Sequence, residues 1–133
     1  MPDHRIRLRA GWECLYRAPD GDGAEVARRV DLPLPWPTDL PARFRLARTF
    51  GRPPVDLATE TVVLELKDAP GLVAARLNGR PVELPQDGPA DLDIPLDDPL
   101  LPRNGLILEV DLGGVAEGSA FPWGAVSLVI RPR

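Results

Sequence analysis

The sequence predicts an all-β protein, an antiparallel β-sandwich of about nine strands in one domain that spans residues 1–133. Three observations lead to this fold class. Apolar and polar residues alternate at every second position in several separate runs, which is typical of strands with one face in a core. The 17 prolines and 12 glycines fall between these runs, where turns join short strands. No longer run keeps a helical period.

The first alternating run covers residues 6–16 and predicts one long strand, or two strands broken near Gly11. Arg5, Arg7 and Arg9 lie on one face of this run. They form either an anion-binding stripe or an ordinary solvated strand face. The net charge of −4 favours the solvated face.

A proline-rich arm follows the next predicted strand, residues 25–34. Pro33, Pro35 and Pro37 remove backbone donors and favour an extended, polyproline-like path. Trp36 lies inside this arm. It either anchors the arm against the sandwich or stands exposed as a stacking platform for a sugar ring.

The third predicted strand, residues 42–50, places an arginine on its apolar face. Phe44, Leu46 and Phe50 alternate on that face, and Arg48 falls between the last two. An inward arginine needs a carboxylate or carbonyl partner. Arg48 is therefore either part of a buried structural ion pair or a residue that faces a site at the end of the sheet.

The middle of the chain predicts a strand at residues 61–67 with one face in the core, followed by a hairpin. The hairpin strands are residues 73–77 and 80–84, and Asn78 and Gly79 join them. Asn-Gly is the strongest short hairpin signal, because both residues tolerate the positive φ that a type I′ turn needs.

Three further strands are predicted in the C-terminal half, at residues 91–96, 106–112 and 126–130. Residues 102–105, with the sequence Pro-Arg-Asn-Gly, are expected to form a turn, and residues 113–120 a loop of small residues. Strands far apart in sequence pair in such sandwiches, so we expect the first and last strands to share the core.

Composition excludes several kinds of catalytic and metal site. Cys14 is the only cysteine and His4 the only histidine. His4 falls in the first residues, which we expect to be mobile, so the sequence predicts no Ser-His-Asp or Cys-His site. A multi-histidine metal site and an internal disulfide are excluded by the counts alone. The aspartates at positions 91, 93, 97 and 98 form an acidic patch, which either binds calcium through carboxylates and backbone carbonyls or is simply solvated. The solvated interpretation is favoured, because outward aspartates on a strand are ordinarily solvated. The sequence predicts no metal site and no cofactor.

Charge and hydropathy also limit the partners. A net charge of −4 argues against a general nucleic-acid binder. No stretch approaches the roughly 20 apolar residues of a membrane span, and the first residues have no apolar core of signal-peptide length. We therefore expect a cytoplasmic protein without nucleic-acid or membrane partners.

Two segments carry a family resemblance. Residues 73–82, VAARLNGRPV, look like the V-x-x-x-LNG-x-x-(apolar) hairpin of galactose-binding-like jelly rolls. That group includes the N-terminal sugar-binding domain of family 2 glycoside hydrolases, the β-galactosidase and β-glucuronidase relatives. Residues 92–94, with Leu100 and residues 104–110, are similar to a strand pair of the same domain. Weaker echoes lie at residues 48–50 and 123–128.

The resemblance implies a jelly roll and a non-catalytic carbohydrate-binding or accessory module. In the glycosidases the catalytic carboxylates lie in a separate barrel domain, so no enzyme is expected here. The alternative is a structural or protein-interaction sandwich without a sugar site. The candidate ligand-binding residues are Trp36, Trp123, Arg48 and Asn78. Each also has a structural interpretation: Asn78 in its turn, Trp123 in core or loop packing, and Arg48 in an internal ion pair.

Overall fold

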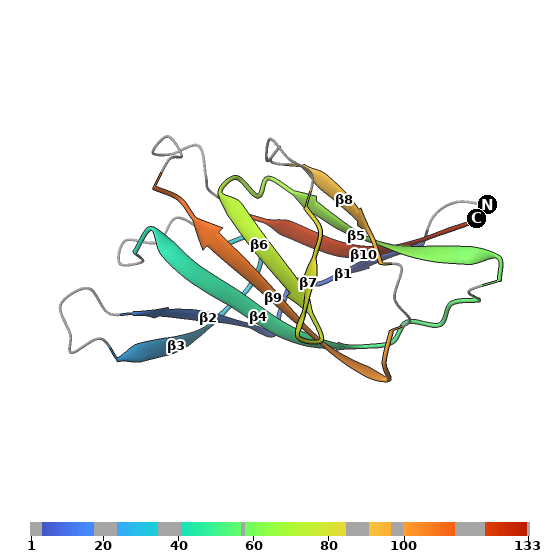
Figure 1. The fold of residues 1–133 in the computed structure, drawn as a ribbon, viewed down its shortest axis with the longest axis horizontal. Helices are drawn as coiled ribbons and strands as arrows, with labels where there is room; N and C mark the ends of the chain where they lie inside the picture. The colour runs from blue at the N-terminus through green and yellow to red at the C-terminus, as the bar shows by residue number, and fades with distance from the viewer. Residues whose placement is uncertain are drawn as a thin grey trace.

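Two antiparallel β-sheets form the two layers of the protein (Figure 1). The computed structural model describes residues 4–17, 24–34, 41–56, 58–84, 91–96, 100–113 and 122–132, and these residues contain ten strands and no helix. In chain order the strands are β1 (His4–Arg7), β2 (Trp12–Arg17), β3 (Glu25–Val30), β4 (Arg43–Gly51), β5 (Glu60–Lys67), β6 (Leu72–Leu77), β7 (Arg80–Val82), β8 (Leu92–Pro95), β9 (Arg103–Asp111) and β10 (Ala125–Pro132). The predicted all-β sandwich is confirmed.

The smaller sheet has the strand order β1-β10-β5-β8, and the larger sheet has the order β3-β2-β4-β9-β6-β7. β1 pairs with β10, so the first and last strands lie side by side as expected. Aliphatic side chains at alternate positions of both sheets face each other in one core, with Leu64 and Leu128 from the smaller sheet and Leu46 and Leu108 from the larger. Burial of this apolar layer supplies the main favourable term in folding.

The N-terminal run forms two strands, the second of the two predicted alternatives. β1 belongs to the smaller sheet and β2 to the larger, and the chain crosses between the layers over residues 8–11. Gly11 has a φ of 85° there, a left-handed conformation that glycine adopts without steric cost.

The Asn78-Gly79 hairpin is confirmed, but the strand before it is irregular. Asn78 and Gly79 have φ values of 54° and 81°, both positive as a type I′ turn requires. A register shift between Leu72 and Ala74 turns Val73 outward, where it is 60% exposed. Val73 therefore does not share the face of Ala75, although the two alternate in the sequence, because a bulge resets the alternation of the strand.

The predicted turn at residues 102–105 was also wrong from Arg103 onward. β9 begins at Arg103, and Asn104 pairs with Phe50 of β4 inside the sheet. Asn104 is only 1% exposed and shares the inward face of β9 with Leu106 and Leu108. The predicted loop at residues 114–120 lies outside the described residues.

β5 differs from the prediction because its outer face is shielded as well. Val63 and Glu65 point away from the core, yet both are buried. Arg5 reaches Glu65 from β1 with two contacts, 2.8 Å and 3.1 Å, and so crosses the intervening β10. Long side chains that cover an outer face in this way hide apolar surface under their stems while the charge is neutralised.

A prediction about chemical reactivity follows from the burial of Cys14. Burial raises the pKa of its thiol to about 11, against a smaller opposing effect of Arg28. At pH 8 about one thiol in ~1,000 is then the reactive thiolate. We expect a disulfide reagent to label the native protein very slowly and the guanidinium-unfolded protein at once. Rapid labelling of the native protein at pH 8 would contradict this placement of Cys14.

Candidate functional site

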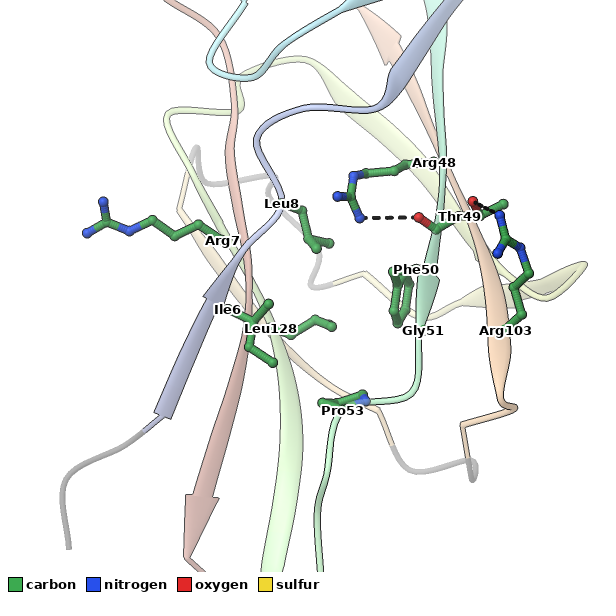
Figure 2. Close-up of a pocket in the computed structure, with 10 residues that line it drawn as sticks. All are labelled: Ile6, Arg7, Leu8, Arg48, Thr49, Phe50, Gly51, Pro53, Arg103 and Leu128. Atoms are coloured by element: carbon green, nitrogen blue, oxygen red, sulfur yellow. Dashed lines mark hydrogen bonds between the residues drawn. The ribbon is translucent and has the colours of Figure 1, made fainter.

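An open pocket of about 370 Å³ lies between β1 of the smaller sheet and the C-terminal half of β4 in the larger sheet (Figure 2). It exists because β2 pairs with β4 only over residues 45–47. From Arg48 onward, the β2 side of β4 has no strand beside it, since the chain before Trp12 has crossed to the other layer. The crossing therefore leaves one end of the sandwich open.

Core side chains from both sheets border the pocket, and they are almost fully buried, since Leu8 is 3%, Phe50 7% and Leu128 1% exposed. Ile6, Leu8 and Leu128 line it from the smaller sheet, while Phe50 and Pro53 line it from the larger. Figure 2 shows Leu8 and Phe50 directed toward each other across the opening. The pocket is thus a continuation of the hydrophobic core that opens to solvent.

Arg48 supplies the polar group that points into this opening (Figure 2). Its Nε donates a hydrogen bond of 2.6 Å to the carbonyl of Ala10, and its Nη1 donates one of 3.2 Å to the carbonyl of Thr49. Burial lowers the pKa of the Arg48 guanidinium. Arg48 therefore has the carbonyl partner expected of an inward arginine, and it also faces a site at the end of the sheet.

Arg7 and Arg103 are the two other positively charged residues that line the pocket. Both are exposed, and Figure 2 shows their side chains on the two outer flanks, directed away from the opening. Arg103 Nη2 donates to the hydroxyl of Thr49 at 3.2 Å. No aspartate or glutamate occurs among the described residues that line the pocket. The pocket is therefore positively charged in a protein whose net charge is −4.

Asn78 lies in the hairpin turn and does not line the pocket. Its Nδ2 donates to Asn104 Oδ1 at 3.0 Å, and its Oδ1 accepts from the backbone N–H of Gly105 at 2.9 Å. The side chain that was a candidate ligand contact thus ties the hairpin to β9.

Asn104 is the important residue that the sequence reading missed. Its Oδ1 also accepts from the N–H of Leu101 at 2.8 Å, and its Nδ2 donates to the carbonyls of Leu101 at 2.9 Å and Phe50 at 3.4 Å. The available signal was its position, two residues before Leu106, in register with the apolar face of β9. Through Phe50, this network supports the wall of the pocket.

The two candidate tryptophans have different outcomes. Trp123 is 0% exposed, its Nε1 donates to the carbonyl of Pro70 at 2.7 Å, and its ring packs edge-to-face with Phe44 at 6.4 Å between centroids. The structure gives it a packing role and not the open face that stacking on a sugar requires. Trp36 lies outside the described residues.

The described ranges hold no group of three or more histidine, cysteine, aspartate or glutamate residues that could bind a metal ion. Of the acidic patch, Asp97 and Asp98 lie outside these ranges. Asp91 accepts the backbone N–H of Asp68, and Asp93 lies 3.5 Å from Arg131. Across the same ranges, no helix has the length and apolar character needed to cross a membrane.

Comparison with known proteins gives structural relatives only. No family model matches the chain, and no curated protein matches it. An FMN-binding beta-glucuronidase from Facaelibacterium prausnitzii L2-6 matches 96% of this chain and 22% of its own, with a TM-score of 0.71 and 23% identity. A GH2 beta-galacturonidase from Eisenbergiella tayi, bound to galacturonate, matches 97% and 24%, with a TM-score of 0.64 and 17% identity. A putative beta-galactosidase from Bacteroides fragilis matches 98% and 23%, with a TM-score of 0.65 and 14% identity.

These matches cover almost all of this chain but less than a quarter of each enzyme. At such low identity they bear on the fold and not on the activity. They agree with the fold that the sequence resemblance implies. The chain has the β-sandwich fold that glycosidases of family 2 contain as one part of a much larger molecule.

Proposed function

We propose that this protein is a non-catalytic module that binds a carbohydrate in the pocket between β1 and β4. The observation that carries the proposal is the pocket itself, an opening of about 370 Å³ with apolar walls and one inward guanidinium. This volume lies at the lower end of the range for small-molecule sites, ~300–1,000 Å³. It suits a ligand the size of one sugar ring better than a long chain.

The chemistry of the walls is compatible with a sugar. A pyranose ring presents C–H groups on its faces, and Leu8 and Phe50 offer apolar surface to them. Its oxygen atoms accept hydrogen bonds, and Arg48 is a donor at the same place.

A binding role without catalysis is supported by the missing acids. Hydrolysis of a glycosidic bond ordinarily needs two carboxyl groups, roughly 5 to 9.5 Å apart, around the scissile bond. The described lining residues include neither aspartate nor glutamate. The similarity to a part of each glycosidase, rather than to the whole, points in the same direction.

The alternative is a structural or protein-interaction sandwich. It is favoured by the internal use of Asn78 and Trp123, two of the four candidate contacts. In that case no sugar would perturb the pocket, and only the scaffold would be shared with the glycosidases.

A titration with sugars, monitored through the amide chemical shifts, distinguishes the carbohydrate-binding module from the structural sandwich. Trp12 and Trp123 are both fully buried, so amide shifts report on the pocket more directly than these two indoles do. We expect neutral or acidic monosaccharides at millimolar concentration to shift the amides of Leu8, Phe50 and Gly51. The turn at Asn78 and Gly79 should not move. Absence of any shift, or shifts spread over the far strands, would reject the carbohydrate module in favour of the structural sandwich.

A further inference from the structure

Both asparagines of the chain precede a glycine, and the structure places the two pairs in opposite surroundings. Asn78 and Gly79 form the exposed two-residue turn between β6 and β7. Asn104 and Gly105 lie within β9, where Asn104 is only 1% exposed. The same dipeptide therefore occurs once at the surface and once in the core.

An asparagine before a glycine is chemically labile, because the chain itself can displace the side-chain amide. The backbone nitrogen of the glycine attacks Cγ of the asparagine, so that a new C–N bond closes a succinimide ring and the Cγ–Nδ2 bond breaks. Nδ2 leaves as ammonia with the proton of the attacking nitrogen. Water then opens the ring at either carbonyl and gives aspartate or isoaspartate. Glycine has no side chain that hinders the approach of its nitrogen.

From the two surroundings we infer that Asn78 is a site of spontaneous deamidation in the folded protein and that Asn104 is protected. The attacking group is available at the first site, since among the described residues no hydrogen-bond acceptor meets the N–H of Gly79. A Cβ placed on Gly79 would meet no atom within 4 Å, so the space beside the turn is open.

At Asn104 both reacting groups are occupied. The N–H of Gly105 donates to Asn78 Oδ1 at 2.9 Å. The carboxamide of Asn104 is fixed by the backbone of Leu101, at 2.8 Å and 2.9 Å, and by the carbonyl of Phe50 at 3.4 Å. β9 also pairs with β4 at this position. Cyclisation there requires β9 to leave the sheet, and the opening of a core strand takes up to the whole free energy of unfolding.

Asn78 needs a much smaller opening. Its carboxamide leaves two bonds before Cγ can turn toward Gly79: Nδ2 donates to Asn104 Oδ1 at 3.0 Å, and Oδ1 accepts from the N–H of Gly105 at 2.9 Å. The first bond is partly buried and the second is exposed, so water can replace both. Such local openings at the surface require far less free energy than the separation of strands.

The product weakens the link between the hairpin and β9. An aspartate at position 78 has an oxygen in place of Nδ2, and this oxygen faces Asn104 Oδ1. Asn104 cannot turn its amide to offer a donor, because its Oδ1 and Nδ2 both bind the backbone of Leu101. Isoaspartate also adds a carbon to the backbone of the turn. We therefore expect the modified protein to be less stable.

The test is an incubation of the folded protein for several days at mildly alkaline pH, which deprotonates more of the attacking amide. Cleavage after Arg103 places the two asparagines in separate peptides, and mass spectrometry measures the loss of each amide. A sample taken at the start corrects for deamidation during the digest. We expect Asn78 to react more than about tenfold faster than Asn104, because only Asn104 has to wait for a strand to open. In guanidinium the two rates should become similar.

Two variants test the two halves of the inference. Asn78→Asp carries the main feature of the product, so its melting temperature should lie below that of the native protein. Asn104→Ala removes the acceptor of Asn78 Nδ2 and should speed deamidation at Asn78 severalfold, with circular dichroism as the check that the variant is folded. If Asn104→Ala does not fold, the comparison of the folded and unfolded native protein still decides the question.

Equal rates at the two asparagines of the folded protein would overturn the inference, since the fold would then not distinguish them. Loss of neither amide from the folded protein, after a time in which the unfolded protein has lost both, would overturn it as well. In that case the two bonds of Asn78 would block the reaction. An unchanged melting temperature of Asn78→Asp would contradict the effect of the product on the hairpin.

Discussion

Replacing Trp123 with alanine is expected to lower the free energy of unfolding by about 3–5 kcal/mol. The indole is 0% exposed and packs edge-to-face on Phe44, so its removal leaves a large cavity between the sheets. The change also leaves the carbonyl of Pro70 without the hydrogen bond from Nε1. Trp123 also bridges Leu34 by two backbone hydrogen bonds of 2.7 Å and 2.8 Å, which alanine can still form, so the expected loss comes from the side chain.

Chemical denaturation followed by circular dichroism measures this loss. Trp123→Phe is the control, because it keeps an aromatic ring and removes the indole N–H together with part of the volume. We expect a smaller loss, about 1–3 kcal/mol. A Trp123→Ala variant that lost less than about 1 kcal/mol would show that the indole is not a central part of the core.

Replacing Asn104 with alanine should cost about 2–4 kcal/mol, the second largest effect we expect. The change leaves the N–H of Leu101 and the Nδ2 of Asn78 without their acceptor, and the carbonyl of Leu101 without its donor. These groups are only partly accessible to solvent, so water replaces the lost hydrogen bonds only in part.

Two further variants test the same network by denaturation. Asn78→Gly preserves the positive φ of the turn and removes only the links to Asn104 and Gly105, so we expect a loss of about 1 kcal/mol. Asn104→Asp keeps acceptor oxygens for Leu101 and Asn78 but removes the donor to the carbonyls of Leu101 and Phe50, so this variant should also be less stable than the native protein. Stability of Asn104→Ala within about 0.5 kcal/mol of the native protein would contradict the proposed role of the network.

Local patterns predicted most of the strands. The alternation in β5, β8 and β10 is regular, and each of these strands pairs with neighbours that bury the same face. The turn at Asn78 and Gly79 was equally predictable, because its conformation depends on two adjacent residues. Such features need no knowledge of the rest of the chain.

The features that were not predicted depend on distant partners. The bulge at Val73 follows from the way β6 meets β9, and the burial of Asn104 follows from bonds to Phe50 and Asn78. The motif Arg-Asn-Gly reads as a turn in isolation, but β4 extends it as a strand. Tertiary pairing overrides local turn preference in this case.

The pocket is another feature that depends on residues far apart in the sequence and was not predicted. Arg48 was identified as an inward arginine from its position in the strand, but its neighbours were not. Leu8 and Phe50 come from different sheets, and only the crossing of residues 8–11 between the layers brings them to one opening. Arg5 and Arg7 lie two residues apart in β1 and are both exposed, but their surroundings differ, since Arg5 binds Glu65 and Arg7 lines the pocket.

The position of β1 has a mechanical consequence. This strand has four residues, lies at the margin of its sheet and pairs with β10 alone. A molecule bound between Ile6 and Leu8 on one side and Phe50 on the other would contact both sheets. It would do so beside β1, which has only one neighbouring strand. A bound ligand would then hold β1 in place. The resistance of β1 to thermal unfolding would rise with the concentration of the ligand.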